Sequence, residues 1–329
     1  MTVLITGGAG YIGSITARQL IEAGEDVIVF DNLEHGSREA VAGMPFMEGD
    51  IRDAAALEQV MRAENVDAVI HLAAYKSVAE SMEAPERYFR NNVGGTLTLL
   101  ETMVRCGVEI VVFSSTCAVY GTPEHLPVTE STPVQPESPY AESKLMGEQM
   151  LKWFDQCHDI RSASLRYFNA AGATMEGEIG EDPAGAANLI PIVLSAVLDN
   201  ERPVTVFGTD YPTPDGSGVR DYVHVLDLAD AHLRSLEYLR SGGSSTCLNI
   251  GTGIGVSVLE IIEKVEEASG LKVPVEYGAR REGDPASSWA DPGKARETLG
   301  WTAKHGLDDI ISSAWNWQSS LHATAVSRR

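Results

Sequence analysis

The segment that most constrains the fold lies near the start of the chain, where glycines follow a short apolar run. Val3–Thr6 is expected to be a buried strand, and the next residues satisfy G-x-G-x-x-G through Gly8, Gly10 and Gly13. Counted from Gly7, they also satisfy G-x-x-G-x-x-G. Glycine permits a tight turn and lets the backbone approach a pyrophosphate at the positive end of a helix. We therefore predict a strand, a phosphate-binding loop and a helix in that order.

Two acidic positions extend this prediction. Asp31 closes the second apolar run, 18 residues beyond Gly13, where a carboxylate would hold the adenosine ribose hydroxyls. An acid at this position favours NAD over NADP as the cofactor. Asp50 and Ile51, after the third strand, are placed to frame the adenine.

The first half of the chain alternates β-rich runs with amphipathic stretches, which predicts a parallel sheet with helices on both faces. The expected strands are Val3–Thr6, Val27–Phe30, Ala68–Leu72, Ile110–Ser114 and Ala163–Tyr167, with Cys247–Ile250 returning to the sheet. Expected helices include Ile15–Ala23, Ala55–Ala63, Asn188–Leu198, Asp227–Leu239 and Val258–Ala268. We expect a doubly wound (Rossmann) domain over 1–168, with return segments near 225–251. Residues 169–329 should form mainly a smaller, discontinuous domain that binds substrate.

Charge and cysteine content exclude several classes of function. A formal net charge of −22 makes nucleic acid or an anionic membrane a poor partner. The four cysteines are scattered, and no pair has metal-site or redox-motif spacing, so we expect no metal and a reduced, cytoplasmic setting. A first strand this early leaves no room for a signal peptide, and no apolar run reaches the roughly 20 residues that span a bilayer.

A tyrosine and a lysine four residues apart are the strongest catalytic signal. Ser138 and Pro139 are expected to open a long helix that carries Tyr140 and Lys144 on one face. Free tyrosine has a pKa near 10, and nearby positive charge from Lys144 and an oxidised nicotinamide would favour the phenolate. Thr116 follows the preceding strand, at the sheet edge where doubly wound folds bind ligands. We expect Tyr140 to act as a base there.

With these residues, the chain resembles the UDP-glucose 4-epimerases (UDP-galactose 4-epimerases) of the extended short-chain dehydrogenase/reductase superfamily. The resemblance runs nearly end to end and rests on stretches more specific than the superfamily signature. These stretches are Asp31–Leu33, Glu48–Arg52, Ser114–Gly121, Leu165–Asn169, Phe207–Gly216, Val219–Tyr222 and Arg280–Asp284.

The resemblance implies a role for individual residues. Tyr140, Lys144 and Thr116 would be catalytic. The NAD contacts would be Gly7, Gly10, Tyr11, Ile12, Gly13, Asp31, Asn32, Asp50, Ile51, Leu72, Ala73, Ala74, Lys76, Asn91, Ser114, Tyr140, Lys144 and Phe168. The UDP-sugar contacts would be Lys76, Thr116, Tyr140, Asn169, Asn188, Leu189, Val206, Phe207, Arg220, Tyr222, Arg281, Asp284 and Ser288.

The resemblance further implies interconversion of UDP-galactose and UDP-glucose by oxidation and re-reduction at C4, in a homodimer. Ser288 departs from relatives that carry a bulky tyrosine near the sugar, so UDP-N-acetylglucosamine and UDP-N-acetylgalactosamine are expected as a further pair. Another nucleotide-sugar 4-epimerase, acting on a UDP-pentose, and a non-catalytic NAD-sensing protein remain alternatives. A nucleotide-sugar dehydratase is disfavoured, since dehydratase relatives place Asp-Glu where Cys117 and Ala118 stand.

Overall fold

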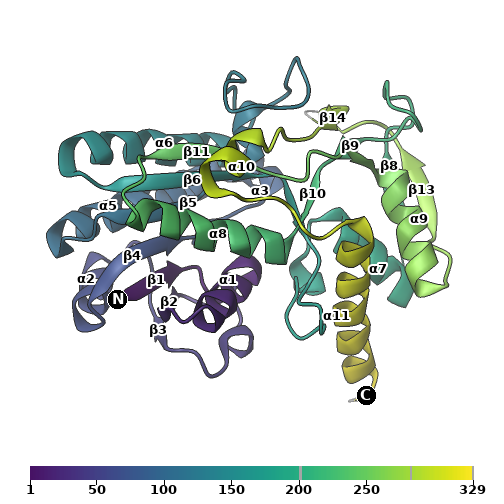
Figure 1. Cartoon of the computed structure of the whole chain (residues 1–329). Helices are drawn as coiled ribbons and strands as arrows, with labels where there is room; N and C mark the ends of the chain where they lie inside the picture. Colours follow the sequence, from purple (N-terminus) through teal and green to yellow (C-terminus); the bar gives the residue numbers. More distant parts are fainter. Residues whose placement is uncertain (200–201, 282–283, 328–329) are drawn as a thin grey trace.

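A parallel sheet forms the centre of the larger part of the molecule (Figure 1). The computed structural model describes residues 1–199, 202–281 and 284–327. Within these residues seven strands pair in the order β3-β2-β1-β4-β5-β6-β11, and every neighbouring pair is parallel. The strands are β1 (Thr2–Thr6), β2 (Asp26–Asp31), β3 (Phe46–Glu48), β4 (Val66–His71), β5 (Ile110–Ser114), β6 (Arg161–Tyr167) and β11 (Thr246–Ile250). The order reverses between β1 and β4, which is where doubly wound sheets bind ligands.

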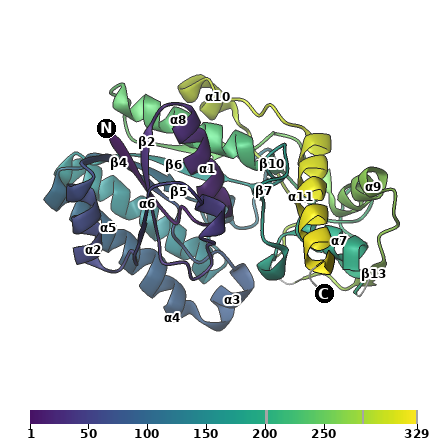
Figure 2. The same cartoon turned by 90° about the horizontal axis from the view of Figure 1, so that it is seen from below.

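Helices cover both faces of this sheet because successive strand side chains point to opposite sides (Figure 2). Val3 and Ile5 pack in one buried cluster with Leu20 and Leu236, whereas Leu4 packs in another with Leu99. The first face is covered by α1 (Tyr11–Glu22), α8 (Val225–Arg240) and α10 (Gly293–Leu299). The second is covered by α2 (Ala54–Ala63), α5 (Gly94–Cys106) and α6 (Pro139–His158), with α3 (Val78–Glu83) and α4 (Pro85–Tyr88) lying before α5 in the chain.

The smaller part of the molecule has its own apolar core. Ile190, Val193, Ile261, Val265 and Ile310 meet there, from α7 (Leu189–Asp199), α9 (Val258–Ser269) and α11 (Leu307–Ser327). Its short strands are β7 (Asn169–Ala171), β8 (Val204–Phe207), β9 (Val219–Arg220), β10 (Tyr222–His224), β12 (Val256–Ser257), β13 (Val275–Gly278) and β14 (Ser287–Ser288). These pair as β10-β7, β12-β9-β14 and β13-β8.

The fold class expected from the sequence is confirmed, and most element boundaries agree within two or three residues. Ser257 caps α9 through a capping box with Glu260, and Gly270 ends the helix at φ 69°. A strand before Asp50 was expected without bounds and is the short edge strand β3, whereas the π-helical turn at Phe89–Val93 was not expected. The division of the chain near residue 168 remains a proposal.

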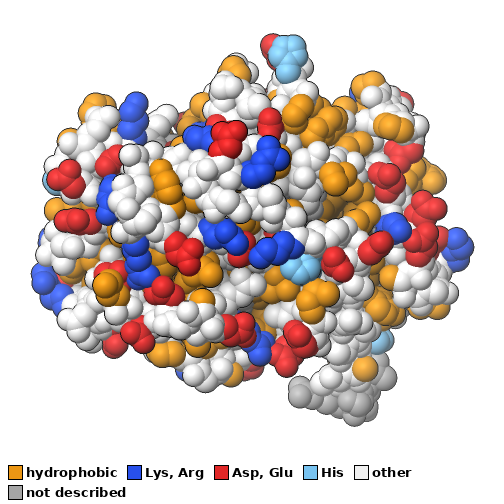
Figure 3. Space-filling view, in the orientation of Figure 1, with side chains coloured by type: hydrophobic (Ala, Val, Ile, Leu, Met, Phe, Trp, Pro, Cys, Tyr) orange, Lys and Arg blue, Asp and Glu red, His pale blue; other side chains and the backbone are white. Residues whose placement is uncertain are grey.

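The surface, the helices and the cysteines bear on the expectations about membranes and metals. On the face shown in Figure 3, acidic and basic side chains are interspersed. Within the described part of the chain, no helix is long and apolar enough to cross a membrane, and no three metal-ligand side chains cluster. All four cysteines are free.

Candidate active site

The glycine loop is closed against the protein on one side and open on the other. Gly7 has φ +71°, and a Cβ there would lie 2.5 Å from the backbone nitrogen of Ala73. At Gly13 a Cβ would lie 2.3 Å from the Gly7 carbonyl oxygen. At Gly10, the N-cap of α1, the nearest atom would be that same oxygen at 3.4 Å. The loop therefore offers the backbone at a helix N-terminus to a ligand, which fits the pyrophosphate of a dinucleotide.

Asp31 ties the end of β2 to this loop. Its carboxylate accepts hydrogen bonds from the backbone N–H of Leu33 at 2.8 Å and of Ala9 at 3.0 Å. Burial raises the pKa of Asp31, while these two backbone bonds lower it. A carboxylate has about four acceptor positions, so lone pairs remain for two ribose hydroxyls. The geometry fits the NAD role expected from the sequence.

Asp50 and Asn32 lie beside each other at the same end of the sheet. Asn32 Nδ2 donates to Asp50 at 3.3 Å, and the Arg52 guanidinium pairs with Asp50 at 2.5 Å. The Arg52 hydrogen bond lowers the pKa of Asp50 to about 2, so this carboxylate is ionised at neutral pH. Ile51 is buried beneath them, 5% exposed.

The segment after β4 packs against the glycine loop, and together with Asp31 and the loop it forms the cofactor cradle. Leu72 N–H donates to the Thr6 carbonyl at 2.9 Å, which sets Ala73 against Gly7 and leads to Ala74. Asn91 lies in the π-helical turn, a feature often found at functional sites. Sequence reasoning missed its neighbour Asn92, whose amide bonds the backbone of Tyr75 and the Ser143 hydroxyl, fixing this segment to α6.

Lys144 lies buried at the carboxyl end of β5. The residue is 4% exposed, and its Nζ donates a hydrogen bond to the Ser114 carbonyl at 2.7 Å. Burial lowers the pKa of Lys144 to about 7. The ammonium also lies 5.2 Å from the centre of the Phe113 ring.

Tyr140 occupies the same buried site, and burial dominates its pKa in the chain alone. Burial raises the pKa of Tyr140 well above 10.0, and the neighbouring Tyr167 raises it further. A hydrogen bond with Thr116 acts in the opposite direction. In the chain alone, burial outweighs this hydrogen bond, and the expected effect of Lys144 together with an oxidised nicotinamide stays a prediction. Ser114 Oγ and the Tyr167 hydroxyl lie 2.5 Å apart on the adjoining strand end, next to the buried Phe168.

A buried ionic network contacts the carboxyl end of β5. The Arg166 guanidinium pairs with Glu148 at 2.5 Å, with both side chains under 10% exposed. Glu148 also accepts a hydrogen bond from Ser115 Oγ, the residue between Ser114 and Thr116. Arg166 donates to the Tyr120 hydroxyl at 2.9 Å. Sequence reasoning missed this network because its members come from separate elements.

Many of the residues expected to hold the UDP-sugar lie on or near the short strands of the smaller part. Arg220 pairs with Asp284 at 3.1 Å, and the Arg281 guanidinium lies 4.1 Å from the centre of the Phe207 ring. Ser288 pairs in register with Arg220. Glu282 and Gly283, within the Arg280–Asp284 stretch, lie outside the described residues.

The remaining expected substrate contacts differ in exposure. Asn169 donates to the Asp221 carbonyl at 3.1 Å, and Leu189 begins α7 beside Asn188. Burial raises the pKa of Tyr222 to about 12, so it is a neutral hydroxyl. The Val206 side chain is 1% exposed in the smaller core, which leaves only its backbone for a ligand.

These features combine a glycine loop suited to a dinucleotide, a buried group of Tyr140, Lys144 and Thr116, and two arginines of the smaller part, Arg220 and Arg281. Such a site can bind a nucleotide diphosphate and move a proton at a hydroxyl beside the cofactor.

Known proteins are similar to this chain over nearly their full length. The chain is 47% identical over 322 residues to a UDP-glucose 4-epimerase of Lacticaseibacillus casei, with 97% of both chains covered. A UDP-glucose-4-epimerase of Stenotrophomonas maltophila, solved with NAD and formylated UDP-arabinopyranose, has TM-score 0.95 and 42% identity, covering 98% of this chain and 99% of that one. The UDP-Glc/GlcNAc 4-epimerase of Campylobacter jejuni has TM-score 0.85 and 38% identity, with 97% and 99% covered. Residues 3–251 match the NAD dependent epimerase/dehydratase family, and the chain belongs to that family.

Proposed function

We propose that this protein interconverts UDP-galactose and UDP-glucose by inverting the hydroxyl at C4 of the sugar, with NAD as a resident cofactor. The observation that carries the proposal is the buried Tyr140–Lys144 pair, next to Thr116 and the glycine cradle. Full-length relatives named UDP-glucose 4-epimerase support the substrate class.

The chain's own residues would divide the work as follows. A bound oxidised nicotinamide would supply the acceptor for a hydride from C4 and, once reduced, the donor that gives it back. Tyr140 receives the proton of the 4-hydroxyl, so that C4 becomes a ketone, and later gives the proton back. Thr116 hydrogen-bonds the same oxygen, while Lys144 holds ribose hydroxyls and supplies positive charge. Inversion follows if the keto sugar turns before hydride returns to its other face.

Tyrosine deprotonation needs help that the chain alone does not supply, since burial raises the pKa of Tyr140. The cationic nicotinamide ring is the group whose charge can offset that cost when the cofactor is bound. The proposal therefore ties base strength to the oxidised form of the cofactor.

Anchoring of the nucleotide falls to the smaller part of the molecule. Arg220 and Arg281 are suited to a diphosphate because a guanidinium binds phosphate oxygens in a forked manner. Holding UDP firmly there leaves the sugar ring free to turn near Tyr140. The dehydratase alternative is disfavoured further, because burial raises the pKa of Cys117 to about 12 and leaves it unsuited as an acid–base group.

UDP-N-acetylhexosamines form a second proposed substrate pair. Ser288 is small and half-buried in β14. Consecutive strand residues point to opposite faces, and the neighbouring Trp289 ring packs against Gly255 instead. The space beside Ser288 is therefore not taken by that indole.

The test follows UDP-galactose conversion to UDP-glucose without added NAD, using wild type and Tyr140→Phe. Wild type should turn over, and the variant should lose about 10²–10⁴-fold in kcat with UDP affinity retained, since only the proton acceptor is removed. Absence of conversion by wild-type protein that carries NAD would contradict the proposal.

A homodimer is proposed as the working assembly. Two neighbouring helices expose apolar side chains: α5 carries Leu97 and Val104, and α6 carries Met146 and Trp153. The two residues on each helix are seven positions apart, so they lie on the same helix face. Trp153 is 63% exposed. Trp153→Glu should shift the sedimentation coefficient from dimer to monomer, whereas a wild-type monomer would contradict this assembly.

The free cysteines support the expected cytoplasmic setting.

A further inference from the structure

Glu181 is a buried carboxylate placed between the two halves of the proposed site. It follows the segment that leaves β7 and precedes the short turn Pro183–Gly185. Its side chain is 8% exposed. One carboxylate oxygen accepts from Lys76 Nζ at 2.8 Å and from Asn188 Nδ2 at 2.8 Å, and the other accepts from Asn188 Nδ2 at 2.9 Å. The family resemblance assigns Lys76 to both the NAD and the UDP-sugar, and Asn188 to the UDP-sugar.

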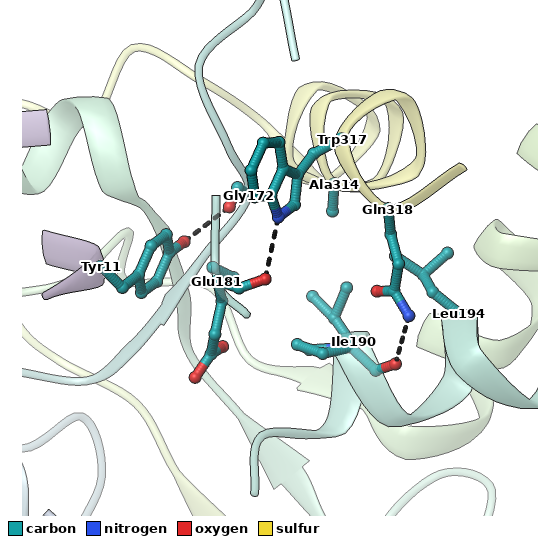
Figure 4. A pocket seen from close by; sticks show the side chains of 10 residues that line it. Tyr11, Gly172, Glu181, Ile190, Leu194, Ala314, Trp317 and Gln318 are labelled. Carbon is teal, nitrogen blue, oxygen red and sulfur yellow. Dashed lines mark hydrogen bonds between the residues drawn. The ribbon is translucent and has the colours of Figure 1, made fainter. Parts of the chain in front are cut away.

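The backbone that carries Glu181 is fixed by other contacts (Figure 4). Its carbonyl oxygen accepts from Trp317 Nε1 of α11 at 2.9 Å. A Cβ on Gly180 would lie 2.4 Å from the Trp317 ring, so the indole packs closely on this segment. The Tyr11 hydroxyl, at the start of α1, donates to the Gly172 carbonyl at 2.6 Å. In Figure 4 the Glu181 carboxylate points away from the indole.

We propose that Glu181 is a positioning residue that orients Lys76 and Asn188 together toward the nucleotide ligands. An ionised carboxylate only accepts hydrogen bonds, so it must face the ammonium of Lys76 and the NH₂ group of Asn188. Because the NH₂ group of Asn188 faces Glu181, its amide oxygen is directed away from this carboxylate. The ion pair also limits the rotamers of the Lys76 side chain, which is 61% exposed. The inference rests on the proposed function for the roles of Lys76 and Asn188.

A purely structural role accounts less well for these contacts. An ion pair with an exposed lysine contributes little to folding stability. Glu181 also places a negative charge in a site meant for anionic ligands, where its charge raises the Tyr11 pKa in addition to burial. A carboxylate in that place is useful if it directs donors toward the ligands.

The first test compares Glu181→Gln with Glu178→Gln. Glu178 is the matched control because it lies on the same segment as Glu181 and also forms an ion pair, with Arg18 at 2.6 Å, but its side chain is 54% exposed. An amide at 181 would present an NH₂ group to Asn188 and no charge to Lys76. UDP affinity by calorimetry should fall about tenfold in Glu181→Gln, as expected when one charge-assisted hydrogen bond is misplaced. Less NAD should be released from the purified variant on denaturation. The control should match wild type in both.

Steady-state kinetics and a double variant separate positioning from structure. KM for UDP-galactose should rise in Glu181→Gln with kcat changed less, because Tyr140 and Lys144 are untouched. The NAD losses of Glu181→Gln and Lys76→Met should not add in the double variant, because both remove the same interaction. Glu181→Asp, which keeps the charge but shortens its reach, should show the same losses and serves if Glu181→Gln does not fold.

Wild-type UDP affinity and NAD content in both Glu181 variants, or full additivity with Lys76→Met, would overturn the positioning role. These binding measurements stand apart from turnover. If wild type binds UDP and NAD but does not epimerise UDP-galactose, the proposed reaction fails while the role of Glu181 is still decided.

Discussion

Replacing Lys144 by methionine should stabilise the fold while abolishing most activity. Lys144 is 4% exposed, and burial lowers its pKa from 10.5 to about 7. At pH 7 such a shift makes folding about 4 kcal/mol less favourable than for an unshifted lysine. Methionine avoids that cost but removes the donor to the Ser114 carbonyl, which costs roughly 1–3 kcal/mol. The expected net gain is about 1–3 kcal/mol, or roughly 2–5 °C in Tm.

The stabilisation should depend on pH in a defined direction. Between pH 7 and 10.5 the folded state binds fewer protons at Lys144 than the unfolded state, so wild type gains stability as the pH rises. Lys144→Met lacks this group, and its advantage should shrink by about 2 kcal/mol between pH 7 and 9. Lys152→Met, an exposed position on the same helix, is the control and should change neither Tm nor turnover.

The assay is urea unfolding of nucleotide-free protein at both pH values, because loss of a bound dinucleotide would itself lower stability. Epimerase turnover is measured in parallel. A variant that is less stable than wild type by the same amount at pH 7 and 9 would refute the reasoning, since the buried charge would then not be the source of the cost.

Three further outcomes follow from the site and its surroundings. Purified wild type should release NAD rather than NADP on denaturation, and Asp31→Ala should carry less of it; NADP as the main nucleotide released from wild type would contradict the assignment. Ser288→Tyr should suppress turnover of UDP-N-acetylglucosamine and spare UDP-galactose, which a competition assay would show; equal loss on both sugars would speak against a size effect. Arg166→Leu alone should lower the free energy of unfolding in urea by about 3–5 kcal/mol, because it leaves the buried Glu148 carboxylate without its ionic partner. The double variant Glu148→Leu/Arg166→Leu should lose less, and simple additivity of the two single effects would exclude coupling.

Features set by local sequence were predictable. The glycine loop, Asp31 at the end of β2 and the helix opened by Ser138 depend on residues within one short segment. Apolar runs buried on both faces identified most sheet strands for the same reason. No bounds were predicted for the edge strand Phe46–Glu48 because it has three residues, none of them buried, and so carries too little apolar pattern.

Features set by tertiary contacts were not predictable. The Tyr140 pKa depends on how completely the surrounding elements exclude water, and sequence spacing showed only that Lys144 shares its helix face. Glu181 meets Lys76, which lies 105 residues away in the sequence. A single acidic residue in a loop carries no signal of such a partner.

The ion pairs at the site show how a chain of net charge −22 can take an anionic ligand. Lys76 pairs with Glu181, and Arg220 pairs with Asp284. Each cation is thus held in place by a carboxylate that accepts only part of its hydrogen-bonding capacity, since an ammonium has three donors and a guanidinium five. The unused donors can meet phosphate oxygens without the cation moving, so less conformational entropy is lost on binding. Acidic residues near the site can therefore favour binding of a diphosphate by orienting its partners, although their charge alone would oppose it.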